Sequence, residues 1–112
     1  TGDIFLVEGN VELWHKEELA QYKNIEFFGK IGILKAGGKN IGICHELFLV
    51  NEVLKGKVDI VFYGHTHRPW IEKKSGVLII NPGTIGGVFT RATFAVWDTN
   101  KKEPELKLLE EF

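Results

Sequence analysis

Two histidines separated by a single residue are the most informative chemical feature of this chain. His65 and His67 stand in the stretch Tyr63-Gly64-His65-Thr66-His67-Arg68-Pro69, directly after an apolar, β-branched run over residues 58–62 that predicts a buried strand. Side chains two positions apart on extended backbone face the same way, so both imidazoles can address one metal centre. A surface turn with two solvated histidines is the alternative, because histidine binds metal only where further ligands surround it.

Three more polar side chains follow predicted strands: Asn10 after residues 4–7, His45 after residues 41–44, and Asn81 after residues 77–80. Singly, Gly-Asn and Asn-Pro-Gly are ordinary turn signals, and one histidine after a strand is commonly a hydrogen-bonded structural residue. If the strands run parallel in one sheet, their ends share the edge where α/β proteins bind ligands. An amide oxygen with three imidazoles suits a first-row transition metal better than calcium or magnesium. The predicted ligand set is Asn10, His45, His65 and His67.

The elements that must position these side chains are many short strands and two helices. The predicted helices cover residues 13–22 and 47–54, and hairpin turns are predicted at 37–38 and 74–76. This mixture predicts an α/β domain with sheets and helices packed outside them. With 112 residues, 44% of them hydrophobic, we expect one domain over residues 1–112 rather than two. Strands are predicted at 4–7, 25–28, 31–35, 40–44, 58–63, 70–72, 77–80, 93–97 and 105–109.

Composition excludes several classes of protein. A net charge of -1 argues against general nucleic-acid binding and against binding to anionic membranes, and no stretch is long enough for a membrane span. A single cysteine, Cys44, excludes an internal disulfide and fits a reducing compartment, so we expect a cytoplasmic protein. Cys44 and His45 are neighbours on a predicted strand and face opposite sides, which favours a buried core cysteine over a Cys–His dyad.

The chain resembles the calcineurin-like metallophosphoesterases in four motifs that occur in order: Gly9-Asn10-Val11-Glu12, Ile43-Cys44-His45, Tyr63-Gly64-His65-Thr66-His67 and Asn81-Pro82-Gly83-Thr84. The resemblance is closest to the small single-domain phosphodiesterases of bacteria and archaea, a branch that is similar to the retromer scaffold subunit. It implies a two-sheet β-sandwich flanked by helices, with two divalent transition ions (Mn, Zn, Fe or Ni). It also implies that Asn10, His45 and His65 ligate one ion, that His67 helps ligate the other, and that the substrate is a phosphate ester.

The N-terminus departs from the family pattern. The family's Asp-x-His and bridging Gly-Asp motifs lie upstream of Gly-Asn, yet only nine residues precede Asn10. Asp3 lies seven residues before Asn10, too close for the helix that the family places between them, so we interpret Asp3 as a turn residue. The chain has no methionine, which initiator removal would explain, but we favour a start inside a longer protein. The expectation is an N-terminally truncated domain that lacks three of seven ligands.

Smaller departures bear on single positions. Val11 stands where family members carry a proton-donating histidine or cysteine, and Glu46 stands where glycine is common. Glu46 is open to three interpretations: a compensating ligand, a salt-bridged surface group, which we favour, or a sign of drift. Arg91 resembles the family arginine that follows Asn-Pro-Gly and predicts a phosphate clamp, although a solvated loop arginine is equally open. Asn81 and Arg91 are the predicted substrate-binding residues.

The leading hypothesis is the C-terminal portion of a metal-dependent phosphodiesterase that uses metal-activated water and is inactive as an isolated chain. The alternative is a degenerate, non-catalytic scaffold of the same fold, with contact aromatics among Trp14, Trp70, Phe89 and Trp97. A third hypothesis is a module that binds one ion through Asn10, His45 and His65. Strand edges exposed by truncation predict a homo-oligomer or a partner that covers them.

Overall fold

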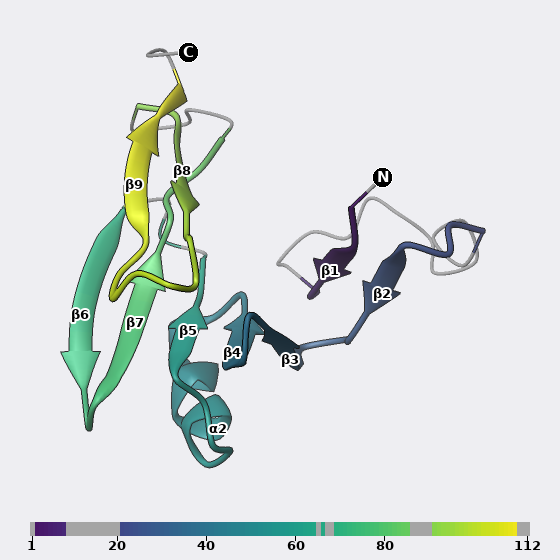
Figure 1. Ribbon diagram of the computed structural model, residues 1–112, viewed down its shortest axis with the longest axis horizontal. Coiled ribbons are helices and arrows are strands. Elements are labelled where there is room, and N and C mark those ends of the chain that lie inside the picture. Colours follow the sequence, from purple (N-terminus) through teal and green to yellow (C-terminus); the bar gives the residue numbers. More distant parts are fainter. Residues whose placement is uncertain (1, 9–20, 65, 67–68, 86–90, 110–112) are drawn as a thin grey trace.

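The structure, a computed structural model, describes residues 2–8, 21–64, 66, 69–85 and 91–109. In this part of the chain the centre of the fold is a five-stranded mixed sheet with the strand order β3-β4-β5-β7-β6 (Figure 1). The elements are β1 (Ile4–Leu6), β2 (Ile25–Phe27), β3 (Ile31–Ala36), β4 (Lys39–Cys44), the 3₁₀ helix η1 (Leu47–Leu49), α2 (Val50–Leu54), β5 (Ile60–Phe62), β6 (Trp70–Lys74), β7 (Val77–Asn81), β8 (Thr93–Val96) and β9 (Glu105–Leu108).

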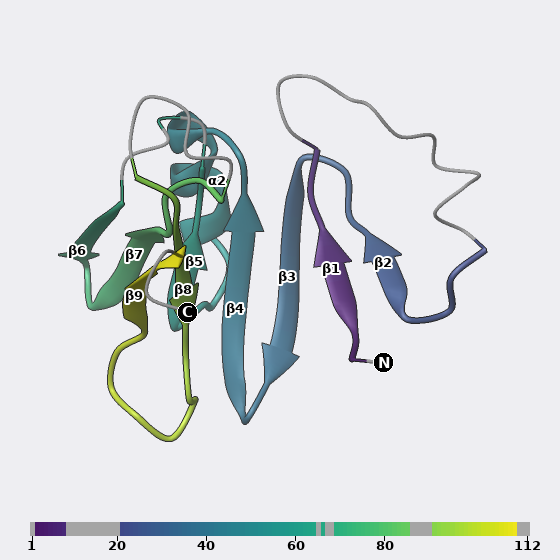
Figure 2. The same cartoon turned by 90° about the horizontal axis from the view of Figure 1, so that it is seen from above.

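The three middle strands of the sheet, β4, β5 and β7, run parallel, while β3 and β6 flank them as antiparallel hairpin partners. Ile60 of β5 lies beside Ile41 of β4 and Leu78 of β7, so the three carboxyl ends meet at one edge. The remaining described strands form two pairs: β1 with β2 in parallel, and β8 with β9 as an antiparallel hairpin (Figure 2). The predicted mixture of sheet and helix is confirmed.

Two apolar layers bury the faces of the sheet. On one face, α2 supplies Val50 and Val53, which pack with Val61 and Ile79. Gly42 of β4 permits this approach, since a side chain there would run into Val53. On the other face, the β8–β9 hairpin places Trp97 and Leu106 over a buried cluster of Ile41, Ile60 and Ile80. The sheet is therefore the middle layer, and its parallel strands are apolar, β-branched runs because both faces are covered.

The predicted strands are all confirmed with small shifts at their ends. The predicted strand 58–63 is wrong at its start, because β5 begins at Ile60. Asp59, just before it, is hydrogen-bonded to Asn40 of β4: each backbone N–H donates to an oxygen of the other residue at 2.8 Å. The predicted helix 47–54 begins as the 3₁₀ turn η1, and no side chain caps its start. The helix predicted over 13–22 lies mainly outside the described residues. In the part that the structure describes, no helix is long and apolar enough to cross a membrane.

Candidate functional site

Backbone hydrogen bonds connect the segments at the carboxyl ends of the three parallel strands. The backbone N–H of Gly64, after β5, donates to the carbonyl of His45, after β4, at 3.0 Å. The N–H of Tyr63 donates to the carbonyl of Ile80, near the end of β7, at 2.9 Å. The predicted shared edge is thus present, and it brings His45, Gly64 and Asn81 together from positions far apart in the sequence.

Gly64 is needed here for close approach rather than for an unusual backbone angle. A Cβ added at residue 64 would lie 3.3 Å from Nδ1 of His45, tighter than an ordinary carbon–nitrogen contact. The imidazole of His45 therefore packs directly against the residue that precedes His65. His45 also lines a cavity of about 540 Å³ together with Phe62, with the turn 82–85 and with residues 93–95.

Asn81 joins the β7 turn to the loop that carries the His-x-His sequence. Its side chain is 0% exposed. The amide Nδ2 donates to the hydroxyl of Thr66 at 2.7 Å and, more weakly, to the carbonyl of Gly64 at 3.5 Å, while Oδ1 accepts the N–H of Gly83 at 2.9 Å. Every polar atom of the side chain is engaged, so Asn81 acts here as a positioning residue. Its predicted contact with substrate stays a prediction.

Thr93 anchors the same turn from the other side. Its hydroxyl donates to the carbonyl of Pro82 at 2.8 Å, and its N–H donates to the carbonyl of Thr84 at 2.9 Å. Gly83 adopts a φ of 86°, a conformation that favours glycine, and a side chain there would collide with Thr93. Arg91 lies two residues before this anchor and is exposed. Its predicted role as a phosphate clamp stays a prediction.

A second cavity, of about 400 Å³, lies on the α2 side of this edge. Its lining includes Thr66 and four further residues: Leu47, Tyr63, Trp70 and Glu72. The pKa of the Tyr63 hydroxyl is raised, mainly by burial and then by the negative charge of Glu72, although a hydrogen bond with Asn81 acts in the opposite direction. The hydroxyl is therefore protonated at neutral pH.

Cys44 belongs to the core and not to the site, as predicted. The thiol is 3% exposed and donates to the carbonyl of Glu46 at 3.6 Å. Burial, followed by the charge of Glu46, raises the pKa of Cys44 to about 11, so the nucleophilic thiolate is disfavoured. Glu46 itself is half-buried, and neither the ligand nor the surface interpretation of its carboxylate is tested.

Of the predicted metal ligands, only His45 lies within the described residues; Asn10, His65 and His67 lie outside them. Among the described side chains, no three histidine, cysteine, aspartate or glutamate residues gather as a metal-binding group. The imidazole of His45 is a donor type that transition ions accept, and it lies at the carboxyl edge of the sheet beside the residue that precedes His65. The predicted ligand set stays a prediction. Sequence reasoning missed Thr66 and Thr93 as anchors, since a lone threonine carries no pattern that reveals its partner.

The sequence matches a protein-family model and a phosphodiesterase that are consistent with each other. The sequence model of the calcineurin-like phosphoesterase superfamily domain matches residues 2–102. A phosphodiesterase of Methanocaldococcus jannaschii is 42% identical over 60 residues, which are 53% of this chain and 36% of that protein. This match therefore spans about a third of the length of the curated relative.

Solved structures share the fold. The structure of a novel archaeal phosphodiesterase superposes with a TM-score of 0.81 at 27% identity, covering 96% of this chain and 69% of the other. The Vps29 protein of Entamoeba histolytica, solved in complex with Zn²⁺, gives a TM-score of 0.55 at 22% identity over 76% of this chain and 57% of the other. The second likeness concerns the fold alone.

Proposed function

Because this chain belongs to the calcineurin-like phosphoesterase superfamily, we propose that its complete protein is a metal-dependent phosphodiesterase that hydrolyses a phosphate ester with an activated water. The observation that supports this most directly is the packing of the His45 imidazole against Gly64 at the carboxyl edge of the parallel strands. That contact places one predicted ligand beside the loop that carries two others.

In the proposed mechanism, Asn10, His45, His65 and His67 would hold divalent transition ions. When bound, such ions lower the pKa of water and stabilise charge on the phosphoryl oxygens. Gly64 leaves room for the His45 ring, and Asn81 fixes the loop through Thr66. Arg91 would offset the charge of the substrate phosphate.

The four proposed ligands are all neutral, whereas a site for two divalent ions would need carboxylates to offset their charge. We therefore propose that residues 1–112 alone bind metal but turn over little substrate. Full activity would require the carboxylates of the family's Asp-x-His and Gly-Asp motifs, supplied by a longer protein.

Metal binding tests the site directly. Equilibrium dialysis with Mn²⁺ or Zn²⁺ should show binding that His45→Ala weakens at least tenfold. His15→Ala is the matched control, because His15 lies outside the four motifs, and it should leave the affinity unchanged. Equal affinities for the two variants would remove His45 from the site.

Hydrolysis tests the activity. The coding segment upstream of residue 1 would be restored, and turnover of bis(p-nitrophenyl) phosphate would be followed with Mn²⁺ and with EDTA. We expect metal-dependent turnover by the longer protein only. A folded, metal-loaded longer protein without turnover would refute the phosphodiesterase proposal.

A non-catalytic scaffold is the second candidate, and exposed apolar side chains favour it. Leu47 is 51% exposed, Phe48 is 71% exposed and Trp70 is 54% exposed, and Leu47 and Trp70 line the same cavity. A scaffold has no need for metal. Absence of stoichiometric metal from the longer protein, together with loss of a partner on Phe48→Ser, would favour this candidate over the enzyme.

A further inference from the structure

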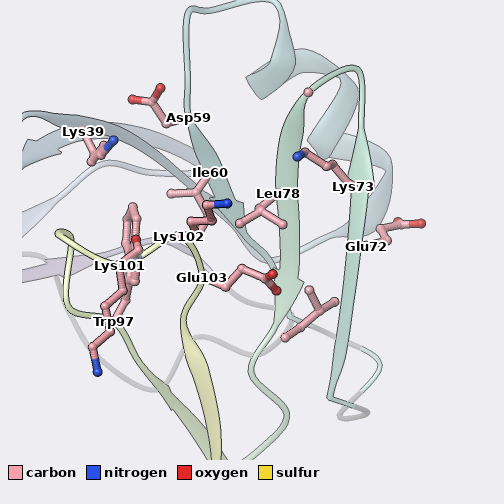
Figure 3. A pocket seen from close by; sticks show the side chains of 12 residues that line it. Lys39, Asp59, Ile60, Glu72, Lys73, Leu78, Trp97, Lys101, Lys102 and Glu103 are labelled. Carbon is pink, nitrogen blue, oxygen red and sulfur yellow. Dashed lines mark hydrogen bonds between the residues drawn. The ribbon is translucent and has the colours of Figure 1, made fainter.

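A cavity of about 560 Å³ lies at the opposite end of the sheet from His45 and Asn81, and the proposed phosphodiesterase mechanism does not use it (Figure 3). It opens where β5 and β7 begin, between the sheet and the turn that joins β8 to β9. Its volume falls within the range of about 300–1,000 Å³ that is typical of small-molecule sites.

The floor of this cavity is apolar and structurally fixed. Ile60 is buried, while Ile71 and Leu78 are half-buried and pack on the same core cluster. Trp97, also half-buried, forms part of the lining. Its indole N–H donates to the carbonyl of Lys101 at 3.1 Å, which holds the ring in place against the turn. A planar ring can therefore be buried here against an aromatic and an aliphatic surface.

Uncommitted positive charge surrounds this floor. Lys39, Lys73 and Lys102 line the cavity, and within the described residues none of their side-chain amines makes a hydrogen bond or ion pair. Figure 3 shows the amine of Lys102 beside Leu78, and the amine of Lys73 directed toward the strand that carries Leu78. The fourth lysine of the lining, Lys101, lies 3.8 Å from the carboxylate of Glu105.

The acidic residues of the lining offset part of this positive charge. Asp59 lies directly before β5, where its carboxylate accepts the backbone N–H of Asn40 at 2.8 Å, and Glu72 points away from the cavity (Figure 3). Only Glu103 directs its carboxylate toward Leu78. A carboxylate at that position suits the hydroxyl or amino donors of a neutral part of a ligand, and it disfavours a polyanion.

We propose that this cavity is a second binding site that accepts a nucleoside monophosphate. The base packs on Trp97 and the aliphatic floor, Lys73 and Lys102 hold the phosphate, and Glu103 accepts hydrogen bonds from the nucleoside. Inorganic phosphate alone should bind this cavity with low affinity, because exposed lysine amines bind phosphate in competition with water. Ring burial supplies the remainder of the affinity.

Binding of adenosine 5′-monophosphate to this chain tests the site without any catalysis. The titration would be followed by ¹H–¹⁵N spectra at low salt with EDTA present, which separates it from the metal centre. The chain has three tryptophans, and Trp97→Phe identifies the Trp97 indole signal. We expect the nucleotide to shift that signal with saturation. Adenosine and inorganic phosphate should each bind at least tenfold more weakly than the nucleotide.

Charge variants complete the test. Lys102→Ala and Lys73→Ala should each weaken nucleotide binding about three- to tenfold and leave the weak binding of adenosine unchanged. Lys55→Ala is the matched control, since Lys55 pairs with Glu52 on α2 at 3.1 Å, away from the cavity, and it should have no effect. An unmoved Trp97 signal, equal binding by Lys102→Ala and Lys55→Ala, or equal binding of phosphate and nucleotide would each overturn the proposal.

Discussion

Replacing Asn81 with alanine should destabilise the fold by about 2–3 kcal/mol. The change removes two well-formed hydrogen bonds, to Thr66 at 2.7 Å and from Gly83 at 2.9 Å, each with a net contribution of about 1 kcal/mol. It also leaves a small void, because the side chain is fully buried. Thr66 is exposed and its hydroxyl can turn to water, so the loss stays below the value for a stranded buried donor.

Urea unfolding followed by tryptophan fluorescence measures this loss. Asn51→Ala is the matched control, because Asn51 lies exposed on α2, where its amide oxygen accepts a hydrogen bond from Lys74 at 3.3 Å and from no other described residue. That change should stay within about 0.5 kcal/mol of the parent chain. A loss at Asn81 no larger than at Asn51 would refute the assignment of Asn81 as a positioning residue.

A double-mutant cycle isolates the link between the turn and the loop. Asn81→Ala combined with Thr66→Val should show a coupling of about 1 kcal/mol, because each single change removes the same hydrogen bond. If the loop carries metal ligands, Asn81→Ala should also lower Zn²⁺ affinity about 10- to 100-fold. A coupling near zero would show that Thr66 is not held by Asn81 in solution.

Three further outcomes follow from the structure. Gly64→Ala should lower the metal affinity measured by dialysis, since its Cβ would press on the ring of His45, and should destabilise the fold by less than about 1 kcal/mol. Gly2→Ala is the control, because open space surrounds Gly2, and it should change neither the metal affinity nor the urea midpoint. The free energy of unfolding should fall by up to about 1.4 kcal/mol per pH unit between about pH 9 and 11, because the unfolded state releases the Cys44 proton first. Urea titrations of Cys44→Ala across this range should lack that fall. Sedimentation should show self-association, because among the described strands β1 pairs only with β2 and Ile4 is exposed; a monodisperse monomer contradicts this.

The arrangement of strands could be predicted from the sequence because its signals are local. Residues 41–44, 60–62 and 77–80 form short β-branched runs that end in polar residues or glycine, which is the pattern of a doubly covered parallel strand. Once these runs are parallel neighbours, the shared edge follows from topology alone. Because successive side chains on a strand face opposite sides, Cys44 and His45 could also be assigned to opposite faces of the sheet.

The contacts that fix the site could not be predicted, because their partners are distant in sequence. Asn81 and Thr66 are 15 residues apart, and Thr93 and Pro82 are 11 apart. A single hydrogen bond between two such residues leaves no periodic pattern in the sequence. The strand predicted from residue 58 starts later, at Ile60, for a similar reason, since Asp59 bonds with Asn40, 19 residues away.

The packing of Gly64 on His45 has a consequence for how any bound ion would behave during unfolding. The two residues belong to segments that fold back on each other only after the crossover through α2 has closed. An ion bound there would connect those two segments in the folded state, and the urea midpoint would rise as the concentration of the ion rises. Chelation would then loosen the carboxyl edge first and leave the β3–β4 hairpin intact.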